Sequence, residues 1–304
     1  MPEENKYLAP LKAGNSRLLS RCISAVENEW PGYEELLLTS GGGQPIPVIG
    51  ITGAPGAGKS TLIHALVQYW LNENKKIAVL SVDPSSPFHH GALLGDRIRM
   101  QDVFLHPDVF IRSLASRGAL GGLNYKMLEI LQVLQLTSFN YILIETVGVG
   151  QSEVEIAGIA DTTLVLTVPE GGDEVQTMKS GLMEIADIFI VNKCDRDQAD
   201  LFVKNLQLLV HERTQSWETP VIRCIATKGS GIQELNEAIQ KHQRYREQHP
   251  EHRLNQLYEK AYQLIREIRM KDIRKEVLLS MLQEAQQDEH FNLFRWVRTF
   301  YPNT

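Results

Sequence analysis

The sequence is poor in cysteine and has no long apolar run. Its 304 residues include three cysteines that lie far apart along the chain, Cys22, Cys194 and Cys224, and no C-x-x-C pair. This pattern argues against a disulfide framework and against a zinc site, and it is typical of a reducing compartment. No stretch approaches the roughly 18 apolar residues that a transmembrane helix needs. We therefore expect no membrane-spanning segment.

The beginning of the sequence also lacks the features of a targeting segment. Residues 1–6 are polar and acidic, without the apolar core of a signal peptide or the arginines of a transit peptide. We therefore expect a cytoplasmic location, with the mitochondrial matrix applying only if this is a processed form.

An excess of positive charge is missing as well. The chain has 31 lysines and arginines against 37 aspartates and glutamates, a net charge of −6. Proteins that bind nucleic acid need clustered cations to meet the phosphates, so we expect no nucleic-acid partner. Hydrophobic residues make up 43% and charged residues 22%, which is typical of a globular chain. Its length allows one large domain with a smaller appendage.

Apolar strand-like runs alternate with helical patterns over most of the chain. The expected strands are 46–51, 77–82, 109–112, 141–145, 162–168, 188–192 and 220–225. The expected helices between them are 59–73, 122–137, 175–185, 198–214 and 232–246. This alternation predicts an α/β fold, a mostly parallel sheet with helices on both faces, whose ligands bind at the carboxyl ends of the strands.

Helical segments extend the predicted sheet domain at both ends. Residues 16–30 have the spacing of an amphipathic helix that Asn15 or Ser16 can cap, and we expect it to pack on the main domain. After residue 246 only helical patterns follow, with a break near residues 270–272, and they either dock onto the domain or form a dimer arm. The expected parts are an N-terminal extension (1–43), a nucleotide domain (44–248) and a C-terminal dimerisation extension (249–304).

One glycine-rich stretch, Gly53 to Ser60, has the form G-x-x-x-x-G-K-S. It stands between a strand-like run and a helical pattern, which is the context of a phosphate-binding loop. Glycines let backbone N–H groups converge on a phosphate, and the helix that follows adds the positive end of its dipole. In such a loop Lys59 reaches the β- and γ-phosphates and the Ser60 hydroxyl binds Mg²⁺.

The string Asn192-Lys193-Cys194-Asp195 ends another strand-like run and has the N-K-x-D form of a guanine-reading motif. Asp195 can accept hydrogen bonds from guanine N1–H and from the 2-amino group. Adenine offers neither, so it would leave a carboxylate unpaired. Polar complementarity of this kind discriminates by roughly 10⁴-fold or more. Lys193 would lie along the base, and the expected ligands are GTP and GDP.

The run Ile142–Gly148 places an acid after three apolar residues and a glycine three residues later. This matches the D-x-x-G switch of GTPases with Glu145 in place of Asp, so the acid would hold Mg²⁺ through water and the Gly148 N–H would sense the γ-phosphate. Val149 stands where a water-orienting glutamine is common, and Gln151 is an uncertain substitute. We therefore expect slow hydrolysis by the protein alone.

Two further acids precede this run. Asp83 follows an apolar strand and Asp96 follows a loop. Either could approach the metal directly or through water, and either could equally be a helix cap or a turn residue. The pair His89-His90 lies between them, and we leave it out of the predicted site because adjacent side chains in a loop are usually solvated.

Together these strings resemble the MeaB-type GTPases, chaperones of methylmalonyl-CoA mutase that are also known as ArgK or LAO/AO transport-system kinases, within the SIMIBI class of P-loop GTPases. The resemblance runs from about residue 14 to about residue 235, and it is carried by GAPGAGKST, SVDPSSP, LGDRIRM, SRGALGGL, ILIETVGVGQSE, GGDEVQTMKSG and VNKCD. The later part matches only in being helical, and in the family it carries the homodimer contact.

The resemblance implies a role for each matching residue. The phosphate loop would be formed by Gly56, Ala57, Gly58, Lys59, Ser60 and Thr61. The residues implied around Mg²⁺ are Ser60, the switch I acids Asp83 and Asp96, and the switch II acid Glu145. The residues implied in catalysis are Lys59, Asp96, Glu145, Gly148 and, from a third switch loop that couples nucleotide state to the mutase, Asp173 and Lys179. The guanine contacts would come from Asn192, Lys193, Asp195 and the Ala226 N–H.

The chain departs from the family pattern in two places. Ile225-Ala226-Thr227-Lys228 stands where Ser-Ala-x-Lys is usual, which removes a hydroxyl, although the Ala226 N–H could still meet guanine O6. His89-His90 replaces smaller residues in switch I, with an unknown effect.

The resulting hypothesis is a GTP-hydrolysing chaperone that gates adenosylcobalamin loading and protects a B12-dependent acyl-CoA mutase, which would stimulate its hydrolysis. The first alternative is a metallochaperone GTPase that delivers nickel, but the Cys-Pro or His-rich strings of such proteins are missing here. The second is a P-loop kinase or ATPase of the arginine-transport type, for which no residue that would activate an acceptor hydroxyl is identifiable.

Overall fold

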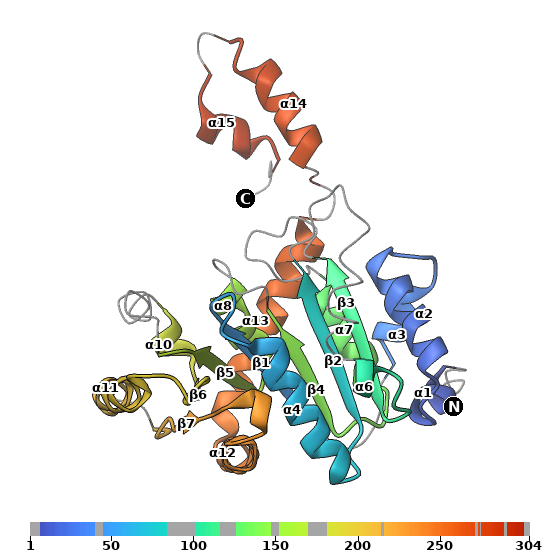
Figure 1. Ribbon diagram of the computed structural model, residues 1–304. Helices are drawn as coiled ribbons and strands as arrows, with labels where there is room; N and C mark the ends of the chain where they lie inside the picture. Colours follow the sequence, from blue (N-terminus) through green and yellow to red (C-terminus); the bar gives the residue numbers. More distant parts are fainter. Residues whose placement is uncertain are drawn as a thin grey trace. The chain divides into compact units, whose positions relative to one another are not determined.

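The computed structural model is built around a seven-stranded sheet in which every neighbouring pair of strands is parallel (Figure 1). The strands are β1 (Val48–Gly53), β2 (Ile77–Asp83), β3 (Val109–Ala115), β4 (Tyr141–Glu145), β5 (Thr162–Thr167), β6 (Ile188–Val191) and β7 (Val221–Arg223). Their order across the sheet is β3-β2-β4-β1-β5-β6-β7. All seven predicted strands are present, which confirms the α/β fold class.

The structure describes residues 7–39, 45–83, 101–115, 126–146, 152–169, 181–213, 216–270, 273, 275–288 and 291–300. The chain forms two units, Met1–Arg253 and Leu254–Thr304. The division falls inside a helix, five residues after the domain boundary that the sequence predicts at residue 248. Among the described helices none is long and apolar enough to cross a membrane.

Helices cover both faces of the sheet because its strands carry apolar side chains on both faces. On one face lie α4 (Lys59–Asn72), α6 (Gln101–Phe104) and α12 (Ile232–Gln248). On the other lie α1 (Leu8–Lys12), α2 (Ser16–Glu27), α3 (Tyr33–Leu37), α7 (Met127–Leu134), α8 (Ser152–Ile159), α10 (Leu182–Ile185) and α11 (Ala199–His211). On the first face Trp70 is fully buried, stacks on Tyr141 with the ring centroids 4.2 Å apart, and donates from Nε1 to Asn236 Oδ1 at 2.8 Å.

The N-terminal helix α2 packs on the main domain, as predicted. The Asn15 side chain caps it by accepting from the Leu18 N–H at 2.9 Å. Its last turn is tied to β3 by a salt bridge of 2.5 Å between Glu27 Oε2 and an Arg112 nitrogen, and its apolar face belongs to the core beneath α7. The predicted N-terminal extension is therefore part of the first unit.

Helix α8 is absent from the predicted helices, because eight residues are fewer than the window over which helical periodicity can be read. It lies unusually close to the middle strand of the sheet. A Cβ atom at Gly50 of β1 would stand 2.4 Å from Cγ1 of Ile156, which is far inside the distance of contact. The glycine in this buried strand thus permits α8 to lie directly on β1.

The second unit is helical, as predicted. Its helices are α13 (Pro250–Arg269), which begins in the first unit, α14 (Lys275–Ala285) and α15 (Leu293–Arg298). The end of α13 at Arg269 confirms the break that the sequence predicts near residue 270. Helix α15 is capped by the Asn292 side chain, which accepts from the Arg295 N–H at 2.9 Å.

Candidate functional site

The predicted functional strings meet at the carboxyl edge of the sheet. The glycine-rich loop follows β1, Glu145 ends the neighbouring strand β4, the N-K-x-D string follows β6, and Ala226 follows β7. The register pairs Ile51 of β1 with Glu145 of β4, so the loop begins directly beside the acid. Parallel strands bring segments that are far apart in the sequence to one edge, which is where open α/β sheets bind their ligands.

The glycine-rich loop has a backbone that only glycine can adopt at two positions. Gly53 has φ 139° and Gly58 has φ 99°, both in the left-handed half of conformational space. A Cβ atom at Gly53 would lie 2.0 Å from the Leu166 carbonyl oxygen, and one at Gly58 would lie 2.5 Å from Asn192 Nδ2. The loop is therefore wedged between β5 and the N-K-x-D segment, with α4 beginning directly after it.

Lys59 is buried within this loop. Its Nζ donates to the Gly53 carbonyl oxygen at 2.7 Å and to the Ala54 carbonyl oxygen at 3.2 Å, and the residue is 8% exposed. The Lys59 side chain thus connects the start of α4 to the first two residues of the loop. A cation held at the N-terminus of a helix is suited to meet an anion such as a phosphate group.

Ser60, which is partly buried, and Glu145, which is buried, form a pair of oxygen ligands. The Ser60 hydroxyl donates to Glu145 Oε1 at 2.7 Å, and the Ser81 hydroxyl of β2 reaches Glu145 Oε2 at 3.4 Å. Within the described ranges, His, Cys, Asp and Glu form no group of three or more that could hold a metal. A hydroxyl beside one carboxylate does fit Mg²⁺, which is usually held by one or two protein oxygens together with substrate phosphates and water.

The buried side chain of Asn192 links two loops of the site. Its side chain is 3% exposed, its Nδ2 donates to the Ala57 carbonyl oxygen at 2.9 Å, and its Oδ1 accepts from the Ala226 N–H at 3.0 Å. One amide therefore joins the glycine-rich loop to the loop after β7. The sequence predicts the Ala226 N–H as a contact for guanine O6, whereas in the structure this N–H is engaged by Asn192.

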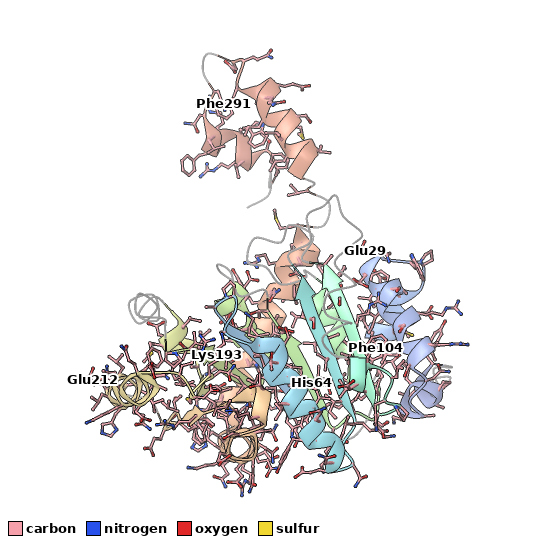
Figure 2. The ribbon with its side chains drawn as sticks, in the orientation of Figure 1. Glu29, His64, Phe104, Lys193, Glu212 and Phe291 are labelled. Carbon is pink, nitrogen blue, oxygen red and sulfur yellow. The ribbon has the colours of Figure 1, made fainter. Side chains whose placement is uncertain are left out.

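The next residues of the N-K-x-D string remain accessible. Lys193 has φ 56°, and its Nζ donates to the Gly56 carbonyl oxygen at 2.8 Å, so the side chain lies along the glycine-rich loop (Figure 2). Asp195 is partly exposed, and its Oδ2 lies 3.5 Å from Lys228 Nζ. Lys228 thus lies beside the carboxylate that is predicted to read the base.

Two cysteines that are far apart in the sequence become neighbours beside the base-reading loop. The Cys194 N–H donates to the Cys224 carbonyl oxygen at 3.1 Å. Burial raises the pKa of the Cys194 thiol, and it raises the pKa of the Cys224 thiol to about 12. Both groups are therefore neutral thiols at neutral pH, the form that neither attacks electrophiles nor binds metal.

Several residues named in the sequence analysis lie outside the described ranges. They are Asp96, Gly148, Asp173, Lys179, His89-His90, Val149 and Gln151. Asp83 ends β2 at the same sheet edge, and only its backbone is described. Thr61 is exposed on the first turn of α4.

Two features of the site were not predicted from the sequence. One is the contact of the Ser81 hydroxyl with Glu145, and the other is the pair of hydrogen bonds by which Asn192 joins two loops. A single hydroxyl in the apolar run IAVLSVD is the signal that points to Ser81, since a buried polar group needs a partner. No sequence signal distinguishes a bracing Asn192 from a base-reading one.

Comparison with known proteins places this site in a family. A sequence profile described as methylmalonyl Co-A mutase-associated GTPase MeaB matches residues 19–281. A candidate GTPase of Pyrococcus horikoshii is 43% identical over 254 residues, which cover 80% of this chain and 79% of that protein. The GTPase ArgK of Escherichia coli is 34% identical over 241 residues, which cover 75% of this chain and 72% of that protein.

A mammalian protein and a solved structure are also similar. The mitochondrial methylmalonic aciduria type A homolog of Mus musculus is 38% identical over 210 residues, which cover 66% of this chain and 50% of that protein. A crystal structure of an LAO/AO transport system kinase aligns over 93% of this chain and 86% of that chain, with a TM-score of 0.67 and 24% identity. The structural likeness supports the fold.

Proposed function

The chain belongs to the MeaB family of methylmalonyl-CoA mutase-associated GTPases, and we propose that it binds and hydrolyses GTP in the cytoplasm to control adenosylcobalamin loading of a B12-dependent acyl-CoA mutase. The observation that carries the nucleotide part is the double hydrogen bond of Asn192 to Ala57 and Ala226. These two bonds join the phosphate-binding loop to the segments that are predicted to contact the base. The groups for the phosphates and the groups for the base are therefore held at a fixed spacing.

The residues have distinct tasks in this proposal. Lys59 neutralises charge on the β- and γ-phosphates and stabilises the transferring phosphoryl group. Asp195 accepts hydrogen bonds from the guanine ring and lies beside Lys228. Ser60 and, through water, Glu145 would hold Mg²⁺, which would supply positive charge at the phosphates, and the Ser81 hydroxyl contacts the carboxylate of Glu145.

We expect guanine nucleotides to bind far more tightly than adenine nucleotides, because adenine leaves the Asp195 carboxylate without its two donors. Isothermal titration of the full-length protein with GTP, GDP, ATP and ADP measures this directly. Asp195→Asn is expected to shift the preference toward xanthine nucleotides, since the amide can donate to their 2-oxo group. Comparable affinities for ATP and GTP would refute the guanine assignment.

The mutase part of the proposal concerns the third switch loop, whose residues Asp173 and Lys179 lie outside the described ranges. A mutase that contacts this loop would accelerate a GTPase that is slow alone, as partners do for other slow GTPases. GTP turnover with and without a purified methylmalonyl-CoA mutase is expected to rise in the wild type. Most of the stimulation should be lost in Asp173→Ala and Lys179→Ala, with basal rates little changed.

Two results would count against this coupling. Equal stimulation in all three proteins would remove the third switch from the mechanism, and no stimulation in the wild type would remove this mutase as the partner. Neither result would alter the guanine assignment, which the titrations test separately.

The exposed apolar face of α13 supports a homodimer formed through residues 250–304. Leu254, Leu257, Tyr258, Ile265 and Ile268 are each more than half exposed and recur at helical spacing. We expect the full-length protein to sediment as a dimer at micromolar concentration and a chain ending at residue 248 to sediment as a monomer. A monomeric full-length protein would contradict the proposal.

A further inference from the structure

Two threonine hydroxyls are bonded to each other at the carboxyl edge of the sheet. Thr146 Oγ1 donates to Thr52 Oγ1 at 3.0 Å, and the two residues are 1% and 0% exposed. Thr146 is the first residue after Glu145. Thr52 directly precedes Gly53, whose carbonyl oxygen accepts from Lys59 Nζ at 2.7 Å. The pair therefore joins the segment that begins with the acid to the beginning of the phosphate-binding loop.

Successive residues of these two strands point to opposite faces of the sheet. The Glu145 carboxylate accepts from the Ser60 hydroxyl, so it faces the side that α4 covers. Thr146 follows it and faces the other side. Thr52 lies on that side as well, because it is two residues after Gly50, on which α8 packs. The chain that leaves β4 is thus held by one side chain on each face.

The backbone at Thr146 continues the pairing of β4 with β1. Its N–H donates to the Ile51 carbonyl oxygen at 3.1 Å, one position beyond the last residue of β4. Gly148, whose N–H is implied to sense the γ-phosphate, stands two residues further along the chain. Since two residues span at most about 7 Å, the point at which Thr146 is fixed limits where that N–H can lie.

Stability alone does not explain a buried pair of hydroxyls. A buried hydroxyl costs free energy unless it is hydrogen-bonded, and two hydroxyls that satisfy each other only offset this cost. Replacing both partners of such a bond by apolar groups of the same shape can be neutral or even stabilising, so two valines would serve the fold equally well. What the hydrogen bond adds is direction, because it fixes one distance and one orientation between the two side chains.

We propose that Thr52 and Thr146 are positioning residues for GTP hydrolysis, an inference that rests on the proposed GTPase function. Their hydroxyl pair fixes the start of the segment from Glu145 to Gly148 against the phosphate-binding loop. The group that senses the γ-phosphate and the loop that holds the phosphates therefore keep one spacing. A misplacement of about 1 Å can cost about 10²-fold in rate. GDP has no γ-phosphate, so its binding does not depend on this spacing.

Two conservative variants of Thr146 test the role of the hydroxyl. Thr146→Val removes the hydroxyl and keeps the methyl group, whereas Thr146→Ser keeps the hydroxyl and removes the methyl group. Single-turnover GTP hydrolysis by the full-length protein is expected to slow at least about tenfold in Thr146→Val and less than about twofold in Thr146→Ser. The dissociation constant of GDP is expected to stay within about twofold of the wild-type value in both variants. A rate that falls as far in Thr146→Ser as in Thr146→Val would overturn the proposal.

The double variant Thr52→Val/Thr146→Val separates positioning from stability. It leaves neither hydroxyl unpaired, so its melting temperature is expected to lie close to that of the wild type. Its rate is expected to stay as low as that of Thr146→Val, because the two threonines act as one unit. A double variant that recovers the wild-type rate together with the melting temperature would show that the hydroxyl pair serves stability only, and would overturn the proposal.

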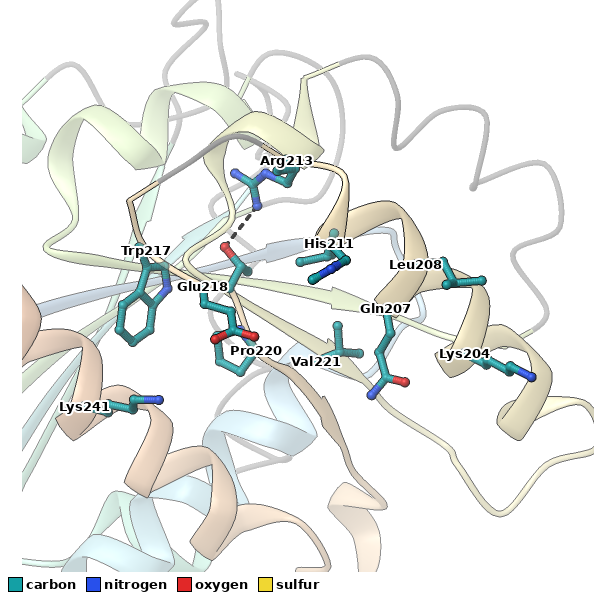
Figure 3. A pocket seen from close by; sticks show the side chains of 12 residues that line it. Lys204, Gln207, Leu208, His211, Arg213, Trp217, Glu218, Pro220, Val221 and Lys241 are labelled. Atoms are coloured by element: carbon teal, nitrogen blue, oxygen red, sulfur yellow. Dashed lines mark hydrogen bonds between the residues drawn. The ribbon is translucent and has the colours of Figure 1, made fainter.

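Thr219 provides a matched control at the amino ends of the strands, where it precedes Val221, the first residue of β7. Thr219 is 7% exposed, and its hydroxyl accepts from an Arg213 nitrogen at 3.1 Å in the wall of a cavity of about 840 Å³ beside α11 (Figure 3). Thr219→Val is expected to lower the melting temperature and to leave the rate of hydrolysis unchanged. An equal loss of rate in Thr219→Val and Thr146→Val would count against positioning.

The same measurements distinguish this proposal from the function on which it rests. Hydrolysis by the wild type at a rate that Thr146→Val leaves unchanged overturns the positioning role and keeps the GTPase function. Absence of hydrolysis by the wild type refutes the GTPase function and the positioning role together.

Discussion

Lys59→Ala is expected to reduce GTP turnover to the background of the assay. Removing one group that stabilises the transition state commonly lowers kcat by roughly 10²–10³-fold, and a buried cation at the phosphates stands at the upper end of this range. The loss also removes the two hydrogen bonds from Nζ to the carbonyl oxygens of Gly53 and Ala54, which belong to the loop itself. Single-turnover hydrolysis with a phosphate-release assay is the measurement.

The control for Lys59→Ala separates chemistry from folding. Lys12→Ala removes an equal charge from an exposed position on α1, and its turnover is expected to match the wild type. Circular dichroism of both variants must match the wild type for the comparison to hold. Wild-type turnover by a folded Lys59→Ala protein would reject the phosphate site.

Asn192→Ala is expected to have the second largest effect, and it acts on binding and on stability together. It leaves the Ala57 carbonyl oxygen and the Ala226 N–H without their partner, and each unsatisfied buried group costs about 1–3 kcal/mol. We expect the free energy of unfolding to fall by about 2–4 kcal/mol. We expect GTP affinity to fall by roughly 10- to 100-fold, because the phosphate and base loops lose their fixed spacing.

Asn236 provides a matched control for Asn192. It is also buried, at 4% exposure, and its Oδ1 accepts one hydrogen bond from Trp70 Nε1, but it lies on α12 and not among the predicted nucleotide contacts. Asn236→Ala is expected to destabilise the first unit by about 1–3 kcal/mol and leave GTP affinity unchanged. Equal losses of GTP affinity in both variants would show that Asn192 acts through general stability alone.

The sequence was sufficient to predict the sheet and the edge at which the site lies. Every strand-like run became a strand, because buried parallel strands are short apolar runs with helices between them. The glycine-rich loop, Glu145 and the N-K-x-D string were therefore expected at the carboxyl ends of strands, and the structure places them at the ends of β1, β4 and β6. Motif spacing and strand alternation carry this information without any knowledge of tertiary contacts.

Contacts between distant segments could not be predicted in the same way. The bonds of Asn192 to Ala57 and Ala226 join residues more than 30 positions apart, and no local pattern specifies them. The closeness of Cys194 and Cys224 has the same origin, since it follows from the pairing of β6 with β7. Helix α8 was missed for a different reason, because its eight residues are too few for helical periodicity to be read.

The stacked pair of Trp70 and Tyr141 gives the first unit an optical reporter of its own. The indole is fully buried, hydrogen-bonded through Nε1, and held on the last turn of the helix that begins with Lys59. Its emission therefore depends on the contact of α4 with β4 and α12, whereas Trp30, which is 48% exposed, samples the solvent near the N-terminal helices. Once the other three tryptophans, Trp30, Trp217 and Trp296, are replaced by phenylalanine, the emission of Trp70 follows the folding of the sheet unit without an attached dye.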